Sequence, residues 1–319
     1  MNYPLVTIGI TSFNALNSIE CAINSATSQS WKNFEIIVVD DCSTDGTFEF
    51  VQKLSAHNKT IRLFRNSVNS GVAVSRNRII VEAKGEFIAF FDDDDQSLPN
   101  RIYAQYRRIT DYERQFAERV HVICHTARKI VYPDGKVRFH KTMGQALRAF
   151  SPYGVAVARR ILLGEPLDDG YGACPTCSQM ARLSTYNLIG GFDPDFRRSE
   201  DTEFNIRLAL AGGHFVGIAE PLVTQKMTKT SEKSLKDEFH YMRLMLYKHR
   251  DFIDNQSVFE FSLSWLWLKQ VWLENNRLSF FKMLIILLIK NPLYSMRRFI
   301  FSIPNIRLNN AFSRFHNDS

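Results

Sequence analysis

The first hundred residues alternate between strand-like and helix-like patterns, and this alternation restricts the fold more than any other feature. Strand-like apolar runs occur at 6–11, 34–39, 61–64 and 86–91. Helical patterns fill the intervals between them, at 17–29, 44–54 and 72–82. The run 34–39 (FEIIVV) is too uniformly apolar for a sheet that is open to water. Strands that alternate with helices predict parallel pairing and a doubly wound α/β sheet.

The remainder of the chain is less regular and ends in a different pattern. We expect a strand at 120–124, a turn at 133–135, a glycine-rich segment at 170–191 and a helix at 201–211 that ends at Gly212-Gly213. From about residue 235 the pattern is helical and aromatic. The apolar content of 45% and charged content of 23% are ordinary for a globular protein, which excludes wholesale disorder. We therefore predict an α/β domain over 1–230 and a helical C-terminal region over 231–319.

Polar and acidic residues follow the strand-like runs, at the edge of the sheet where α/β proteins bind ligands. The most prominent is the acidic run Asp92–Asp95, directly after the strand EFIAFF. Four consecutive carboxylates repel one another, and a hard divalent cation with oxygen ligands relieves that repulsion. The alternative is an acidic surface turn that caps the helix near Pro99. Its place after a buried parallel strand favours the metal site.

A second pair of carboxylates, Asp40 and Asp41, ends the second strand in VVDDCSTDGT. At this position an aspartate can accept hydrogen bonds from a nucleobase or a ribose. The alternative is a helix N-cap, a role that Ser43 or Asp45 fills equally well.

Taken together, five segments resemble glycosyltransferase family 2, which has the GT-A fold, a Rossmann-like mixed and mostly parallel sheet flanked by helices. The segments occur in the family's order and spacing and span about residues 4–225. They are PLVTIGITSFN, SQSWKNFEIIVVDDCSTDGT, NSGVAVSRNRII, AKGEFIAFFDDDDQSLP and YNLIGGFDPDFRRSEDTEFNIRLALAGG. The resemblance implies an inverting transferase that uses a nucleotide sugar.

On the donor side, the resemblance implies a site for a UDP-sugar. Thr11 and Asp41 match residues that contact the base, expected to be uracil, with Asp40 beside them. Arg76, in SRN, matches a residue near the diphosphate, where its permanent positive charge suits the anion.

The resemblance also implies a metal site in the acidic run. Asp92 and Asp94 match the family's DxD pair, which holds Mn²⁺ or Mg²⁺, and Asp95 follows as a further acid. Asp93 stands where the family usually has a small residue. We assign Asp92, Asp94 and Asp95 to the metal, and Asp92 and Asp93 also to the donor, with the exact ligands open.

Asp201 is the candidate general base, because Glu200-Asp201 matches the family's ED motif. Inverting transfer is a direct displacement, which needs a base for the acceptor hydroxyl and a stabilised diphosphate leaving group. The alternative is a first-turn carboxylate favoured by the helix dipole. No Gln-x-x-Arg-Trp motif of the polymerising members follows the base, so transfer of a single sugar is favoured. A metal or redox role for Cys174 and Cys177 is disfavoured, since no second cysteine pair lies at zinc-site spacing.

The C-terminal segment 275–317 contains no Asp or Glu. It holds seven cations: Arg277, Lys282, Lys290, Arg297, Arg298, Arg307 and Arg314. Cations interleaved with aliphatic and aromatic residues are typical of a helix that lies in a membrane interface. The alternative is a helical subdomain that packs on the catalytic domain or on a second copy. Since no secretory signal or spanning helix is evident, we expect a cytoplasmic protein at an anionic membrane surface.

By analogy, membrane-facing members of the family extend a sugar on a polyprenyl diphosphate, which suggests an acceptor of bacterial O-antigen or capsule synthesis. Three other functions fit the sequence less well. A nucleotidyltransferase lacks its Gly-rich basic loop in TSFNALNS, and nucleic-acid binding lacks a recognisable motif. A non-catalytic nucleotide-sugar-binding protein would keep the acidic run without needing Asp201. The sugar, the linkage and the oligomeric state stay open.

Overall fold

The computed structural model describes residues 3–116, 120–148, 150–227 and 235–300. Its chain divides into two compact units. The first comprises Met1–Ala158 and Leu167–Lys229, and the second comprises Arg159–Pro166 and Thr230–Ser319. The short segment Arg159–Pro166, which the sequence assigns to the α/β domain, thus belongs to the helical unit.

The first unit is built on one mixed sheet with the strand order β3-β2-β1-β4-β8-β6-β9-β5, and β7 pairs with β6. Strands β1 to β4 are parallel to one another, as the alternating pattern predicts. Their bounds are β1 Val6–Ser12, β2 Phe34–Asp40, β3 Ile61–Arg65 and β4 Phe87–Asp92. The others are β5 Gln96–Ser97, β6 Val122–Val131, β7 Val137–His140, β8 Gln179–Arg182 and β9 His214–Lys226. The predicted mixed sheet is confirmed, and its pairings in the described chain are divided equally between parallel and antiparallel.

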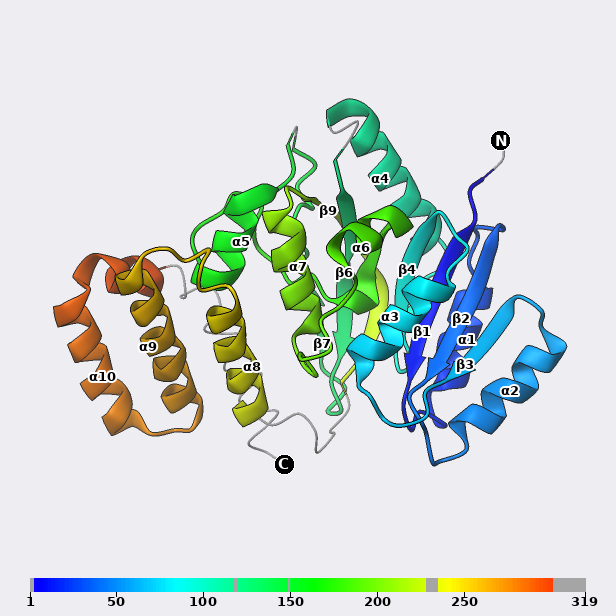
Figure 1. Cartoon of the computed structure of the whole chain (residues 1–319), viewed down its shortest axis with the longest axis horizontal. Coiled ribbons are helices and arrows are strands. Elements are labelled where there is room, and N and C mark those ends of the chain that lie inside the picture. Colours follow the sequence, from blue (N-terminus) through cyan, green and yellow to red (C-terminus); the bar gives the residue numbers. More distant parts are fainter. Residues whose placement is uncertain (1–2, 117–119, 149, 228–234, 301–319) are drawn as a thin grey trace. The chain divides into compact units, whose positions relative to one another are not determined.

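Helices cover both faces of this sheet. Successive residues of a strand point to opposite faces, and Ile8 and Ile10 of β1 join the core that contains residues of α1 (Ile19–Thr27) and α4 (Arg101–Phe116). The residue between them, Gly9, lies against Ile79 of α3 (Val72–Glu82), so α3 packs on the other face. Figure 1 shows α3 and α6 (Leu183–Ile189) in front of the strands. The helices α2 (Thr47–His57) and α7 (Glu200–Leu210) also belong to this unit, and α5 (Gly154–Leu163) contains residues of both units.

Later elements follow the sequence pattern, except that one strand is longer than expected and a short helix lies inside the glycine-rich segment. The strand expected at 120–124 extends to Val131, where β6 and β7 form a hairpin around Gly135, whose φ of 78° suits glycine. The expected helix at 201–211 is α7, and it ends before Gly212, which has a φ of 84°. A short 3-10 helix, η1 (Thr176–Ser178), precedes β8 inside the glycine-rich segment. Its three residues are buried.

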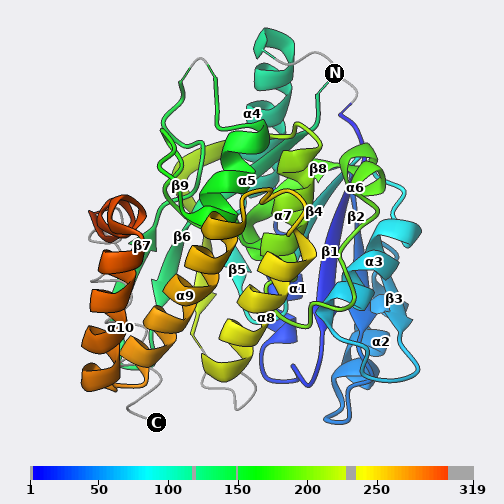
Figure 2. The same cartoon turned by 60° about the vertical axis from the view of Figure 1, so that its left-hand side comes forward.

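In the second unit, α9 (Gln256–Leu273) lies between α8 (Leu235–Lys248) and α10 (Arg277–Lys290), as Figure 2 shows. The core between α9 and α10 is formed by Phe261, Trp265, Leu268 and Leu287, and Phe280, Met283 and Leu284 pack against it. Among the described residues, no helix combines the length and apolar character that a membrane span requires. Of the seven cations in the C-terminal segment, Arg307 and Arg314 lie outside the described residues.

Candidate active site

The parallel register brings the predicted donor residues to one edge of the sheet. Thr11 of β1 is paired with Val39 of β2 on one side and with Asp92 of β4 on the other. The next residue of β1, Ser12, is paired with Asp40. The residues predicted at the ends of three different segments therefore lie side by side, because neighbouring parallel strands end at the same edge.

Asp40 and Asp41 are both buried, and each is held by the loop that follows a strand. The Asp41 carboxylate accepts hydrogen bonds from Asn66 Nδ2 at 2.7 Å, from the Ser70 amide at 3.1 Å and from the Gly71 amide at 2.7 Å. Asp40 Oδ2 accepts one from the Ser43 amide at 3.0 Å. Asp41 therefore fixes the loop that leads into α3, at the mouth of the predicted donor site.

Arg65 faces Asp40. Its Nε lies 3.4 Å from Asp40 Oδ2. Asp40 Oδ1 has no hydrogen-bond partner among the described residues. A buried carboxylate oxygen without a partner is costly, so this atom is available to a ligand's donor group.

The acidic turn (Asp92–Asp95) connects β4 to the short strand β5. Asp95 is 4% exposed, whereas Asp92, Asp93 and Asp94 are half-buried. Asp93 Oδ2 accepts a hydrogen bond from the Phe13 amide at 3.2 Å, which ties the turn to the end of β1. The Asp95 carboxylate faces the thiol of Cys177, and neither oxygen has another hydrogen-bond partner among the described residues. The turn therefore contains one almost fully buried carboxylate whose hydrogen-bond donor in the described chain is a thiol, which is a weak donor.

The electrostatics of the turn disfavour four negative charges. Burial, together with the charges of Asp94 and Asp92, raises the pKa of Asp93 to about 8. Burial, together with Asp92 and Asp94, raises the pKa of Asp95 to about 8 as well. Such shifts mean that the protein alone stabilises the ionised forms poorly. A divalent cation would supply the missing positive charge.

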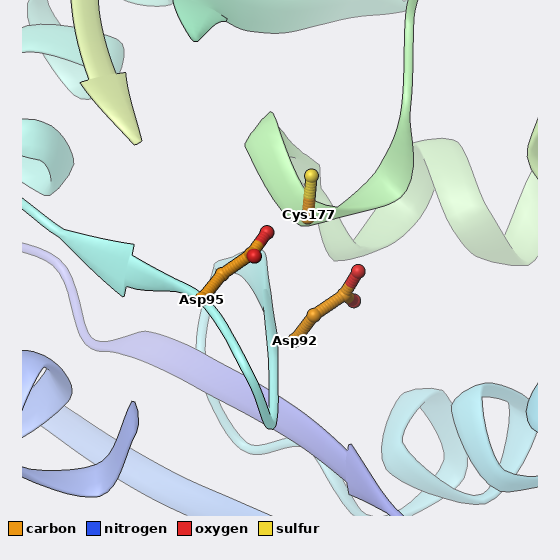
Figure 3. A group of neighbouring side chains, drawn as sticks. All are labelled: Asp92, Asp95 and Cys177. Atoms are coloured by element: carbon orange, nitrogen blue, oxygen red, sulfur yellow. The ribbon is translucent and has the colours of Figure 1, made fainter. Parts of the chain in front are cut away.

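Three side chains converge next to this turn. Ligand atoms of Asp92, Asp95 and Cys177 all lie within 4.8 Å of one another. Figure 3 shows the two carboxylates extending from the turn toward the thiol of Cys177 on η1. Asp94 is on the same turn but is not a member of this group. The unsatisfied buried carboxylate and the converging ligand atoms fit a divalent cation, and the structure favours Asp92 and Asp95 as the first carboxylates to consider.

Arg76 connects the acidic turn to the start of α7. Arg76 is 5% exposed, and its guanidinium donates a hydrogen bond to Asp92 Oδ1 at 3.3 Å and another to Glu200 Oε1. Burial alone would lower the pKa of Arg76, but Glu200, Asp92 and Asp201 outweigh it and the pKa is raised. Arg76 thus stays charged and joins Asp92 to Glu200, which lies 124 positions after Arg76 in the chain.

Asp201, the candidate base, lies in the first turn of α7. Its Oδ1 accepts hydrogen bonds from the Thr202 amide at 2.6 Å and from the Thr202 hydroxyl at 3.2 Å. The residue before the helix, Ser199, has a φ of 59°, a conformation that non-glycine residues rarely adopt. Because Glu200 is tied to Arg76, this sharp entry holds Asp201 at the edge where the acidic turn lies.

Three residues of this arrangement were not assigned a role from the sequence. Glu200 was noted only as part of a motif, and its partner Arg76 is distant in the chain. Cys177 has the CxxC spacing, but its neighbours are carboxylates rather than cysteines. The third is Arg101 of α4, which is 0% exposed. No pattern in the sequence separates Arg101 from the many exposed arginines.

Arg101 links the strands that surround the acidic turn. Its guanidinium donates hydrogen bonds to the Phe90 carbonyl at 2.8 Å, to Ser97 Oγ at 2.8 Å and to the Gln179 carbonyl at 3.4 Å. It therefore connects β4, β5 and β8 around the acidic turn. Burial lowers its pKa to about 10, which still leaves it charged at neutral pH.

Comparison with known proteins decides the family. Residues 7–153 match the model for glycosyl transferase family 2. The putative glycosyltransferase EpsE of Bacillus subtilis is 30% identical over 245 residues, which cover 75% of this chain and 78% of EpsE. The chain belongs to glycosyltransferase family 2. The predicted family and the predicted enzyme class are therefore confirmed.

Other relatives align over a shorter part of their length. The putative teichuronic acid biosynthesis glycosyltransferase TuaG of Bacillus subtilis is 38% identical over 102 residues, 32% of this chain and 40% of TuaG. The UDP-Glc:alpha-D-GlcNAc-diphosphoundecaprenol beta-1,3-glucosyltransferase WfaP of Escherichia coli is 39% identical over 101 residues. Those residues are 32% of this chain and 39% of WfaP.

A solved structure shares the architecture of this family 2 member. The structure of S. aureus TarS 1–349 in complex with UDP-GlcNAc superimposes with a TM-score of 0.58 and 19% identity. The match covers 83% of this chain and 72% of that one. At this identity the likeness concerns the fold, and the predicted GT-A fold is confirmed.

Proposed function

We propose that this family 2 member transfers a single sugar, with inversion, from a UDP-sugar to a saccharide carried on a polyprenyl diphosphate. The observation that carries the proposal is the Arg76 bridge. It joins Asp92, at the end of β4, to Glu200, the residue before the candidate base. One arginine therefore links the predicted leaving-group site to the residue next to the candidate base. A direct displacement requires the leaving-group site and the base to lie close together.

On the donor side, Thr11, Asp40 and Asp41 bind the uridine. Asp40 Oδ1, buried and without a partner in the described chain, accepts a hydrogen bond from the nucleoside. Asp41 keeps the Ser70 and Gly71 amides in place at the entry to α3. In support, TarS was solved with UDP-GlcNAc and WfaP is named for UDP-Glc.

The acidic turn (Asp92–Asp95) holds Mn²⁺ or Mg²⁺ together with the donor diphosphate. Asp92 and Asp95 are the ligands that the structure supports best, Asp94 is the ligand that the family motif suggests, and Asp93 borders the donor. When bound, the cation neutralises charge on the departing diphosphate. Arg76 contributes by orienting Asp92, since its guanidinium contacts that carboxylate and Glu200 rather than open solvent.

Asp201 accepts the proton of the acceptor hydroxyl as that oxygen attacks the anomeric carbon. Both hydrogen bonds from Thr202 go to Oδ1, which leaves Oδ2 for this purpose among the described residues. The bond that forms joins the acceptor oxygen to the sugar, and the bond that breaks releases UDP. Transfer with inversion follows from a single displacement of this kind.

We further infer that α10 lies on an anionic membrane, which would bring the enzyme to a lipid-linked acceptor. One face of α10 packs against α9 through Phe280, Met283, Leu284 and Leu287. The opposite face exposes Leu278, Phe281, Ile285 and Ile289, at the spacing of one helical stripe. Lys282 and Lys290 border this stripe, and each cation near an anionic leaflet contributes on the order of 1 kcal/mol. The alternative is that a second copy of the chain covers this apolar stripe.

The test of the proposed function is a panel of UDP-sugars with Mn²⁺, using undecaprenyl-diphosphate-linked monosaccharides as acceptors. The expected result is UDP release that requires both one UDP-sugar and one lipid-linked acceptor. The product should contain a single added sugar with an inverted anomeric centre, as read by nuclear magnetic resonance. Release of UDP that is independent of any acceptor, or retention of the anomeric configuration, would contradict the proposal.

The metal assignment has its own test within that assay. Replacing Asp94 (Asp94→Ala) should abolish transfer and metal-dependent donor binding. Undiminished turnover of this variant would remove Asp94 from the metal site.

A further inference from the structure

Cys177 occupies an unusual position for a buried cysteine. A buried thiol normally packs like a small apolar side chain. Cys177 is 2% exposed, yet its sulfur lies within 4.8 Å of carboxylate oxygens of Asp92 and Asp95. Figure 3 shows the sulfur next to these two carboxylates. The thiol therefore borders the charged centre of the site rather than an apolar core.

The neighbouring carboxylate points to a ligand at this position. Asp95 is 4% exposed, and apart from the thiol of Cys177 its oxygens have no hydrogen-bond partner in the described chain. Arg101 lies nearby but donates to Phe90, Ser97, Gln105 and Gln179 instead. Two carboxylates and a thiol that converge, with one of the carboxylates unsatisfied, form a built cation site with mixed oxygen and sulfur ligands.

The backbone keeps the sulfur in place. Ser178, which follows Cys177 in η1, is 0% exposed, and its carbonyl accepts a hydrogen bond from Gln105 Nε2 at 2.9 Å. Arg101 Nε donates to Gln105 Oε1 at 3.0 Å, so one buried network holds η1 and the strand before the acidic turn. The distance between sulfur and carboxylates is thus set by the core rather than by a mobile loop.

We propose that Cys177 supplies a sulfur ligand to the cation held by Asp92 and Asp95, so that this site binds Zn²⁺ and Cd²⁺ more tightly than Mg²⁺. Thiolate ligands favour these softer cations, whereas carboxylates and water suit Mg²⁺. The proposal rests on the metal site of the proposed function and adds a ligand to it. On binding, the S–H bond breaks, the sulfur electron pair forms the metal bond, and the proton passes to the buffer.

The consequence is a stronger preference for soft cations than an all-oxygen site would show. Mg²⁺ prefers near-ideal octahedral oxygen coordination and retains several waters. A fixed sulfur on one side of the site satisfies that geometry poorly. Zn²⁺ accepts sulfur at about 2.3 Å and oxygen at about 2.0–2.2 Å, so it accommodates the mixed set.

The test uses the purified full chain without donor or acceptor, so it is independent of whether sugar transfer occurs. Co²⁺ is added as a probe, and thiolate-to-Co²⁺ charge-transfer absorption is recorded. The unaltered protein should show this absorption, Cys177→Ser should lose it, and Cys124→Ser should keep it. Cys124 is the matched control, because it is a fully buried cysteine that is not part of the cluster.

Affinity gives a second readout. Cys177→Ser should weaken Cd²⁺ binding by about tenfold or more while changing Mg²⁺ binding much less. X-ray absorption of the unaltered protein with one equivalent of Zn²⁺ should detect one sulfur neighbour, and this measurement does not depend on the folding of any variant. Absence of a sulfur neighbour, or charge-transfer absorption that persists in folded Cys177→Ser, would overturn the proposal.

If Zn²⁺ shows the sulfur neighbour but no UDP-sugar is ever used, the ligand assignment stands and the proposed function falls. If sugar transfer is found and Zn²⁺ shows oxygen neighbours alone, the function stands and Cys177 is a packing residue.

Discussion

Each unit of this chain concentrates one unfavourable feature, buried charge in the α/β unit and a continuous exposed apolar stripe in the helical unit. In the α/β unit, charged groups such as Arg101 and Asp95 are buried. In the helical unit, large apolar side chains such as Leu278 and Ile289 are 84% and 76% exposed. Each arrangement is unfavourable for an isolated protein in water. Each therefore indicates a partner that is absent from the chain itself.

Buried charge and exposed apolar surface call for different partners. Buried carboxylates call for a cation and a diphosphate, which are small and bind at fixed points. An exposed apolar stripe bordered by lysines calls for an extended surface that is apolar inside and anionic outside. The comparison predicts that the two units can be impaired separately, and four changes test this, beginning with the largest expected effect.

Asp201→Asn should lower the transfer rate by about a hundredfold to ten-thousandfold, the range for loss of a general base. UDP binding should be retained, because the substitution leaves the donor residues unchanged. Steady-state kinetics and calorimetry with UDP measure the two properties. Asp195→Asn, an exposed carboxylate in the loop before α7, is the control and should keep near-normal activity. An active Asp201→Asn enzyme would exclude Asp201 as the base.

Asp95→Asn should remove most of the stabilisation that Mn²⁺ gives to the protein. A cation at one hundred times its Kd stabilises the folded state by about 2.7 kcal/mol. Without metal, the variant should be at least as stable as the original, since it has one fewer carboxylate in a repelling cluster. Thermal unfolding with and without Mn²⁺ measures both effects.

The control for Asp95 is Asp134→Asn, in the exposed turn between β6 and β7, which should leave the Mn²⁺ effect intact. An unchanged Mn²⁺ effect in Asp95→Asn would show that Asp95 is not a ligand.

Arg101→Leu should destabilise the α/β unit by about 3 kcal/mol, because it leaves buried acceptors without a donor. The matched change in the helical unit is Arg243→Leu. Arg243 is half-buried and donates to Gln270 Oε1 at 3.0 Å, so its loss should cost about 1 kcal/mol or less. Urea unfolding measures both. Equal costs would mean that burial of charge does not distinguish the two units.

Ile289→Asp should weaken binding to vesicles of anionic lipid severalfold, with little change in thermal stability or in transfer to a water-soluble acceptor. Val81→Asp places the same charge on α3 of the other unit, at a side chain that is 81% exposed. This control should bind vesicles normally. If Ile289→Asp instead converts a dimer to a monomer in sedimentation, the stripe is an interface between two copies.

The sequence determined the part of the fold that depends on local pattern. The alternation of apolar runs and helical faces sets β1 to β4 and their helices, and parallel pairing then brings Thr11, Asp40 and Asp92 to one edge. Glycine after α7 and the Pro133–Gly135 turn are likewise local signals. These features depend on residues that are close in the chain or on strands that pair in parallel.

Only the tertiary structure decided which side chains meet across long separations. The contact of Arg76 with Glu200 and the approach of Cys177 to Asp92 and Asp95 depend on how η1 and α7 pack against the end of β4. Burial also determined how readily the acidic turn ionises. The same four carboxylates would be an ordinary solvated turn on an open surface, whereas the packed core raises the pKa of Asp93 and of Asp95 to about 8. Composition specifies which charges exist, but the low dielectric of a folded interior determines what it costs to keep them.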